Sequence, residues 1–389
     1  MAENVAEGSG RARAVAAASL VAVAATSCQL GVANPILLVL IVALWRAWRR
    51  GELAGRPAGR KLLAPMALFA AASVASVAFS PHVLASLDKL PRIAILLLAP
   101  AAAALIDETW WPRLVAALAA VATLLAVWGI IQYLQGADTL DDRIHGPMAH
   151  YMIYSGWLLL CVTLLLTELL LDPRRRIWLL LPPVLLGTVA LILSFTRNSW
   201  VGLAAGLLVL AAVWRRQLLL LYPVLAVVVW LVFPRPILDR VISIFDLRQH
   251  SNYDRLCMTI SGLQMVRDYP LTGVGLDMVA RLYPLYRRDD APRWEVPHLH
   301  NNLVQIAAER GLPALAAYLW LIGAYLVATW RAAPRLTGPP RAALAASLVA
   351  TVAITVAGLF EYNFWSASVQ YLTLVVMGVG IGRAEEARG

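Results

Sequence analysis

Residues 15–45 are VAAASLVAVAATSCQLGVANPILLVLIVALW, a stretch that contains no charged side chain. A helix that crosses a bilayer needs about 20 consecutive apolar residues, so this stretch is too long for one crossing. Its middle, SCQLGVANP at 27–35, combines polar residues with glycine and proline, which favour turns. The stretch therefore predicts two membrane-spanning helices joined by a tight turn at residues 31–35.

Similar apolar runs continue through the chain. Of its 389 residues, 60% are hydrophobic and 14% are charged, and the mean hydropathy is +0.70. An ordinary soluble domain is less apolar and more charged, and helices satisfy their own backbone groups inside a bilayer. We expect an all-α polytopic membrane protein with about twelve transmembrane helices, beginning near residues 14, 33, 62, 92, 113, 151, 177, 198, 218, 312, 342 and 366.

The basic residues orient this arrangement. Twelve spans place both termini on one side, and the loops on that side hold nineteen of the 33 lysines and arginines. The short turns on the other side hold four. Cytoplasmic loops are rich in lysine and arginine. The bias predicts cytoplasmic termini and no nucleic-acid partner, since the formal charge of +10 is explained by topology.

The long polar stretch before the last three spans is expected to face outward. The predicted division is nine spans in 1–233, an outer loop domain in 234–311, and three spans with the C-terminus in 312–389. The loop holds ten arginines and nine carboxylates, so it is nearly neutral.

Helical patterns occur within this loop. The segment SNYDRLCMTISGLQMVRDYP, 251–270, predicts a helix ended by its proline. PLTGVG predicts a turn, and LDMVARLYPLYRR a second short helix. The expected apolar stripe of the first helix is Leu256, Ile260, Leu263 and Val266.

Residues 298–311, HLHNNLVQIAAERG, place polar side chains at the mouth of a span. Pro297 and the residues after it predict a helix start, with His298 and His300 in or just before its first turn. A helix N-terminus disfavours the imidazolium form, so a histidine there stays neutral and can accept a proton. The alternative is that both histidines only cap the helix at the membrane interface.

The same stretch resembles a known family. His300 and Asn301, followed after nine residues by Gly311 and a span, are similar to the signature of the O-antigen ligase family of bacterial inner-membrane proteins. Three further segments are similar to family segments: DRIHGPMAHYMIYSG (142–156), SFTRNSWVG (194–202) and DRLCMTISGLQMVRDYPLTGVG (254–275). Ligases, O-antigen polymerases and protein O-oligosaccharyltransferases share this fold.

The resemblance implies an inverting glycosyltransferase in the inner membrane, with its active site at the periplasmic face. The donor would be O-antigen glycan on undecaprenyl pyrophosphate, and the acceptor a sugar hydroxyl of lipid A-core oligosaccharide. ATP and cofactors are not expected. An O-antigen polymerase or protein O-oligosaccharyltransferase is the alternative within the fold. A transporter with an external gating loop is the alternative class, although no duplicated half is evident.

Such a transfer needs a base for the acceptor hydroxyl. His300 is the expected base, with Asn301 or Asn302 orienting its ring or the acceptor. His298 is a secondary candidate, and its side chain is expected to leave the helix in another direction.

The departing pyrophosphate needs cations. Arg197 and Arg255 are the expected ligands because guanidinium pairs bidentately with phosphate oxygens. Arg143 and His145 are secondary candidates. The alternatives are a lipid-headgroup anchor for Arg197 and a surface ion pair with Asp254 or Asp268 for Arg255.

Other residues offer less. Asp254 or Glu295 is the alternative base, and no local metal-ligand spacing occurs, so no metal is expected. Three cysteines without a C-x-x-C pattern favour neither a disulfide framework nor a zinc site. Aromatic residues near span ends are expected to form an interfacial belt: Trp110, Trp111, Trp200, Tyr362 and Trp365.

The charge bias leads to a topology prediction. In a cysteine-free background, an impermeant thiol reagent added outside should label a cysteine placed in 234–297. It should not label Arg56→Cys or Arg335→Cys in intact cells. Outside labelling at either of these two positions would overturn the predicted topology.

Overall fold

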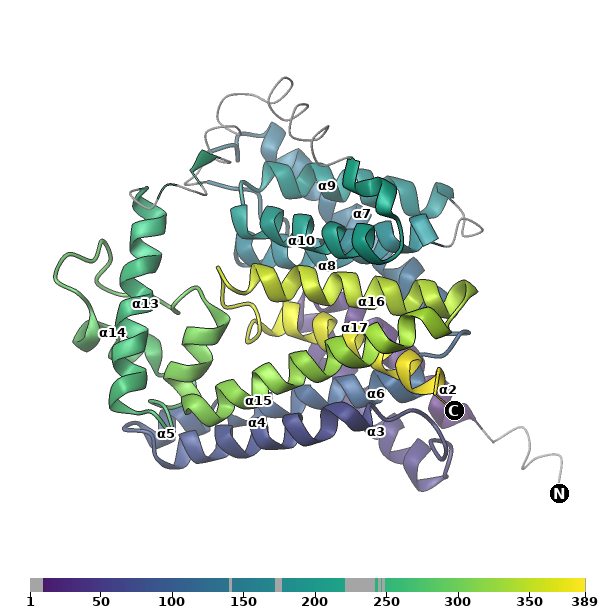
Figure 1. Ribbon diagram of the computed structural model, residues 1–389, viewed down its shortest axis with the longest axis horizontal. Coiled ribbons are helices and arrows are strands. Elements are labelled where there is room, and N and C mark those ends of the chain that lie inside the picture. The colour runs from purple at the N-terminus through teal and green to yellow at the C-terminus, as the bar shows by residue number, and fades with distance from the viewer. Residues whose placement is uncertain are drawn as a thin grey trace.

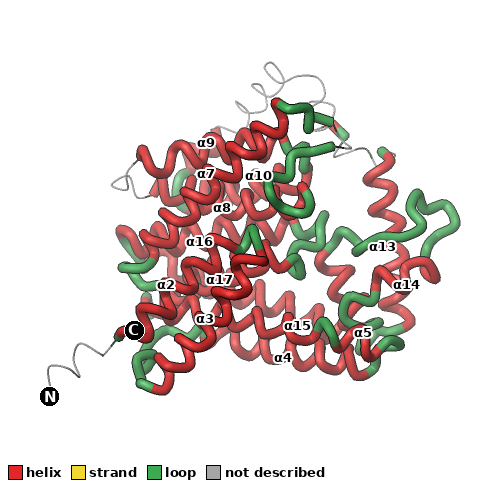
Figure 2. Tube along the Cα trace, turned by 180° about the vertical axis from the view of Figure 1, so that it is seen from behind, coloured by secondary structure: helices red, strands yellow, loops and turns green. Residues whose placement is uncertain are grey.

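The computed structural model describes residues 10–139, 142–171, 177–220, 242–243, 246 and 249–388. Within these ranges the chain forms α-helices and short 3-10 helices, and no strand is present (Figure 2). The predicted all-α fold is therefore confirmed for this part of the chain.

The first half of the chain and the loop region supply many short and long helices. The elements are α2 (Arg11–Thr26), α3 (Leu30–Arg49), α4 (Arg60–Ala78), α5 (Val83–Leu87), η1 (Leu90–Leu97), α6 (Leu98–Leu105), α7 (Trp111–Leu134), α8 (Tyr151–Leu171), α9 (Ile177–Leu193), α10 (Arg197–Val213), η2 (Arg216–Leu220), α13 (His250–Asp268), α14 (Val279–Tyr286), α15 (Asn302–Ala332), η3 (Ala333–Arg335), α16 (Gly338–Ala357) and α17 (Ala367–Glu386).

The long helices lie side by side in layers (Figure 1). α15 packs on α4, α17 packs on α6 and α16, and α16 packs on α8 and α10. α13 and α14 stand at one end of these layers, away from the end where the C-terminus lies (Figure 1).

Seven described helices are long and apolar enough to cross a membrane, namely α3, α4, α7, α8, α15 with η3, α16 and α17. α9 and α10 are apolar but shorter. The predicted span near residue 92 corresponds to η1 followed by α6. The predicted span near residue 218 lies mostly outside the described residues, so the count of twelve and the periplasmic location of the loop stay predictions.

The first turn differs from the expectation. α2 ends at Thr26 and α3 begins at Leu30, so the turn lies at 27–29, and Pro35 lies inside α3. The hydroxyl of Ser27 accepts a hydrogen bond from Trp157 Nε1 at 2.8 Å, and Gln29 Nε2 donates to the carbonyl of Pro147. These contacts from distant residues hold the turn four residues earlier than the glycine and proline predicted.

α13 forms as predicted and ends before Pro270, but its predicted buried face is wrong. Leu256 and Leu263 are exposed, whereas Met258 and Met265 are fully buried. Gly262 permits this packing, because a Cβ there would collide with Leu299 and Val304. The polar and sulfur-containing face turns inward because α15 approaches it closely.

α15 is two helical segments that meet at Gly311. Gly311 has φ 77° and ψ 173°, a conformation that favours glycine. A Cβ at this position would collide with the backbone of Leu271 and Thr272, and Leu312 N donates to the Pro270 carbonyl at 2.8 Å. The break agrees with the predicted boundary between loop and span.

Gly311→Ala should destabilise the protein by about 1–3 kcal/mol, because an alanine is strained at positive φ and collides with the neighbouring turn. Gly323 is the control. It lies in the second segment of α15 with open space around its Cα, so Gly323→Ala should stabilise the helix by about 1 kcal/mol. Equal melting temperatures for the two variants would contradict the role of Gly311.

Candidate active site

A cavity of about 510 Å³ opens where α8, α10, α13 and the two loops before α15 and α17 meet. Five arginines line it: Arg92, Arg143, Arg197, Arg255 and Arg293. A neighbouring cavity of about 300 Å³ has more apolar walls, including Val201, Leu256 and Phe360. The two cavities share His300, Arg197 and Arg255, so the structure brings the three main predicted site residues together.

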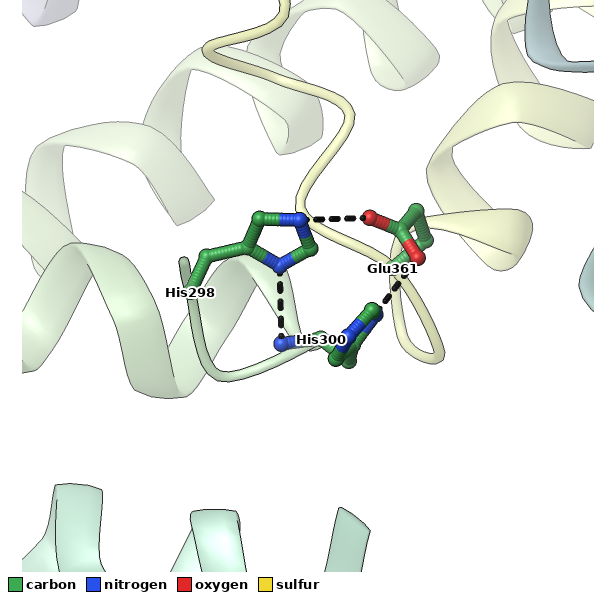
Figure 3. Close-up of side chains that lie close together, drawn as sticks. All are labelled: His298, His300 and Glu361. Atoms are coloured by element: carbon green, nitrogen blue, oxygen red, sulfur yellow. Dashed lines mark hydrogen bonds and ion pairs between the residues drawn. The ribbon is translucent and has the colours of Figure 1, made fainter. Parts of the chain in front are cut away.

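His300 is held by a carboxylate that lies far away in the sequence. Its Nδ1 lies 2.7 Å from Glu361 Oε2, and the other oxygen of Glu361 lies 3.3 Å from His298 Nε2. Figure 3 shows Glu361 between the two rings. Glu361 belongs to the loop that connects α16 to α17.

The hydrogen bonds assign the ring protons. The backbone N–H of His300 donates to His298 Nδ1 at 3.3 Å, so the proton of a neutral His298 sits on Nε2 and points to Glu361. His300 Nδ1 donates to the carboxylate in the same way. This assignment leaves His300 Nε2 with a free lone pair. His300 lines both cavities, so the ring is arranged to accept a proton there.

Electrostatics maintain this state. Burial opposes ionisation of Glu361, but the adjacent His300 and His298 outweigh it and lower its pKa to about 2. Burial lowers the pKa of His298 to about 4, against the attraction of Glu361. At neutral pH the site therefore pairs an ionised carboxylate with a neutral His298.

The prediction that His298 points away from His300 is wrong. Both histidines precede α15, whose N-cap is Asn301, and their ring centroids lie 4.2 Å apart. His300 has φ 51°, so its backbone is left-handed and turns the ring toward Glu361. Such strain persists where surrounding contacts enforce it, and it is common at functional sites.

The two asparagines hold the loops rather than the ring. Asn301 Oδ1 accepts from the backbone N–H groups of Leu303 and Val304, which caps α15. Asn302 Nδ2 donates to Asn363 Oδ1 at 2.8 Å, and its backbone N–H donates to the Gly358 carbonyl. These bonds join the start of α15 to the loop that carries Glu361.

Arg197 is buried at the start of α10, which disagrees with a headgroup anchor. Its guanidinium donates to Asn252 Oδ1 at 2.6 Å and to the hydroxyl of Ser251 and the carbonyl of Ser243, each at 2.7 Å. These described partners are neutral acceptors. Its charge is therefore not cancelled within the described residues and remains available to attract an anion.

Arg255 is half-buried on α13 and lines both cavities. The carboxylates expected as its surface partners are engaged elsewhere. Asp254 lies 3.1 Å from Arg293, and Asp268 accepts a hydrogen bond from the Tyr286 hydroxyl.

The secondary candidates divide. Arg143 lines the larger cavity, with its guanidinium 4.3 Å from the ring centroid of Tyr151. His145 is exposed, does not line either cavity, and bonds to the carbonyl of Met148. His150 lines the larger cavity instead. Glu295, an alternative base, is exposed and lines neither cavity.

Glu361 was missed because its neighbours in sequence are apolar and aromatic. Two of them, Tyr362 and Trp365, were expected in an interfacial belt, but both are buried and line the larger cavity. Trp111 is also buried and donates to Glu168. A charged residue in a short outer loop was the available signal.

His298, His300 and Glu361 also form a group that can hold a metal ion, since their ligand atoms lie within 4.8 Å of one another. No local spacing reveals this group, because one ligand comes from another loop. The hydrogen bonds among the three side chains satisfy them without an ion, and the arginines around the cavity repel a dication. Metal independence stays a prediction.

Residues 182–319 match a family model described as O-antigen ligase. The match supports membership of the chain in the O-antigen ligase family. It spans Arg197, Arg255 and His300 and ends before Glu361. No curated protein matches the chain.

Acidification should destabilise the protein through His298. Its folded-state pKa of about 4 lies below the ordinary 6.5. Between these values the unfolded chain binds a proton that the folded chain does not, so the melting temperature should fall as the pH drops from 6.5 to 4. His298→Gln should flatten this slope, whereas the exposed His145→Gln should leave it unchanged. An unchanged slope in His298→Gln would show that His298 is not held neutral.

Proposed function

We propose that this protein transfers O-antigen glycan from undecaprenyl pyrophosphate to a sugar hydroxyl of lipid A-core oligosaccharide, at the periplasmic face of the inner membrane. The observation that carries the proposal is the placement of His300. Its ring is held by Glu361 and adjoins two cavities, both of which also contact Arg197 and Arg255.

His300 acts as the general base. Its Nε2 removes the proton of the acceptor hydroxyl while the hydroxyl oxygen attacks the anomeric carbon of the donor. The bond from that carbon to the phosphate oxygen breaks, and the pyrophosphate leaves with the electron pair. Attack opposite the leaving group inverts the anomeric configuration. Glu361 stabilises the imidazolium that forms, as carboxylates do in other histidine-dependent sites.

Arg197 and Arg255 stabilise the departing pyrophosphate. Arg197 is preorganised by its bonds to the segment around α13, and a fixed cation loses little energy to reorganisation during the reaction. Arg255 approaches the same space from α13 itself. The shared boundary of the two cavities gives a donor and an acceptor separate approaches to His300.

An O-antigen polymerase or a protein O-oligosaccharyltransferase would use the same chemistry with another acceptor. The test uses purified protein, a lipid-linked glycan donor and EDTA, with rough lipopolysaccharide, a second lipid-linked glycan or an acceptor protein in parallel. Product on rough lipopolysaccharide alone is expected. Product only on another acceptor would change the assignment, and absence of any covalent product with transport of the donor would favour a transporter. Activity that requires added divalent cation would instead assign His298, His300 and Glu361 to a metal.

His300→Ala should nearly abolish transfer while donor binding persists, because proton removal belongs to the chemical step. Glu361→Gln should lower the rate by about 100-fold or more, since it removes the charge that stabilises the imidazolium. His298→Ala should have a smaller effect, because His298 reaches the base only through Glu361. Transfer rates and donor binding are measured together. A fully active His300→Ala variant would refute the base assignment.

Arg197→Ala and Arg255→Ala should each cost about 3 kcal/mol of transition-state stabilisation, and lysine should rescue poorly because it lacks the planar fork. Arg281, which is exposed on α14, provides the matched control. Near-normal transfer by Arg255→Lys and Arg197→Lys, with correct folding, would show that neither clamps the pyrophosphate.

A further inference from the structure

A groove of about 500 Å³ lies between α2 and α3 and does not include any residue of the candidate active site. Its walls are Val15, Leu38, Val39 and Val42, and its floor includes Ala12 and Ala43. Three arginines complete its lining: Arg11, Arg46 and Arg50.

The helix geometry explains why the arginines gather at one end. α2 begins at Arg11, and α3 runs back against it and ends at Arg49. Leu38, Val42 and Arg46 are spaced by four residues, so they follow one face of α3 for about 12 Å. Ala12 and Ala43 are buried between the helices, and their methyl groups are too small to fill the space above them.

The apolar walls face outward. α3 has the least buried membrane-spanning window among the described candidate spans, with 22% of that window buried. Leu38 is 66% exposed and Val39 is 52% exposed. Side chains of this kind in a membrane-spanning helix suit contact with acyl chains, which are as apolar as leucine.

The arginines have little internal neutralisation. Among the described residues Arg11 and Arg46 form no ion pair, and both are exposed. Arg50 lies 3.9 Å from Glu52, but the other oxygen of that carboxylate accepts a hydrogen bond from the backbone of Arg13. The mouth of an apolar groove therefore carries an excess of positive charge at the level where a lipid headgroup would lie.

We propose that this groove binds an anionic phospholipid of the membrane. Its phosphodiester contacts Arg11, Arg46 and Arg50, and an acyl chain lies along Leu38, Val39 and Val42. A zwitterionic lipid brings its own cation to the arginines and is a poorer match. In the predicted topology the arginines mark the cytoplasmic leaflet, opposite the glycan-transfer site, and the inference does not depend on the proposed function.

The test is lipid retention by the purified full-length chain. Phosphatidylglycerol and phosphatidylcholine with identical acyl chains are added in equal amounts, and the bound lipids are counted by native mass spectrometry. Wild type should retain phosphatidylglycerol at least about tenfold over phosphatidylcholine, since each basic residue near a membrane surface contributes about fivefold. The triple change Arg11→Gln, Arg46→Gln and Arg50→Gln should remove the preference.

Two controls separate this site from general charge. The changes Arg60→Gln, Arg331→Gln and Arg335→Gln remove the same charge from other exposed positions and should leave the preference intact. Val42→Trp should fill the groove and reduce retention without changing the charge. Equal retention of the two lipids by wild type, or a preference that survives the Arg11, Arg46 and Arg50 triple change, would overturn the proposal. Displacement of the lipid by equimolar glycerol 3-phosphate would also overturn it, because only the phosphate would then be recognised.

Discussion

The buried ion pair of Glu309 with Arg310 holds together the parts of the protein that meet at the candidate active site. Both side chains are fully buried, with Glu309 Oε2 at 2.7 Å from Arg310 Nη1. The Tyr362 hydroxyl bonds to both partners, and Glu309 Oε1 accepts from Gln305 Nε2 and from the backbone of Asp277. One carboxylate thus links α15, the turn after α13 and the loop beside Glu361.

This pair acts through geometry more than through net stability. A buried ion pair gains little over apolar side chains of the same volume, because both charges lose their hydration. Arg310 lies 4.1 Å from the Trp365 ring centroid and 5.6 Å from that of Phe69, so three elements must be in place before its charge is satisfied. Removing one partner would leave the other charge buried and unpaired. The ion pair follows His300 by one helical segment and adjoins Glu361 in sequence through Tyr362, so it fixes the relative positions of the base and its carboxylate.

Local patterns predicted the helices, the break at Gly311 and the position of His300 just before α15, because each depends on residues within one or two turns. The contacts that complete the site join distant segments. Glu361 lies 61 residues beyond His300, and no periodicity within either segment encodes that pairing. The buried face of α13 was also beyond local pattern, since Gly262 and the approach of α15, rather than hydrophobicity, decide which side turns inward. For the same reason Tyr362 and Trp365 were taken for lipid-facing aromatics.

The candidate site is expensive to hold in shape, and its position in the bundle offsets that cost. His300 and Asp277, which both line the cavity, have positive φ without being glycine, and Arg197 is buried without a described counter-ion. Strained backbone and unpaired buried charge persist only where the surroundings are rigid. The three most enclosed candidate spans are α17, α8 and α16, with 94%, 78% and 72% of their windows buried. Each of them ends at the cavity or at the loop that carries Glu361. The least enclosed span, α3, lies away from it, where contact with lipid in place of protein leaves the reacting groups undisturbed.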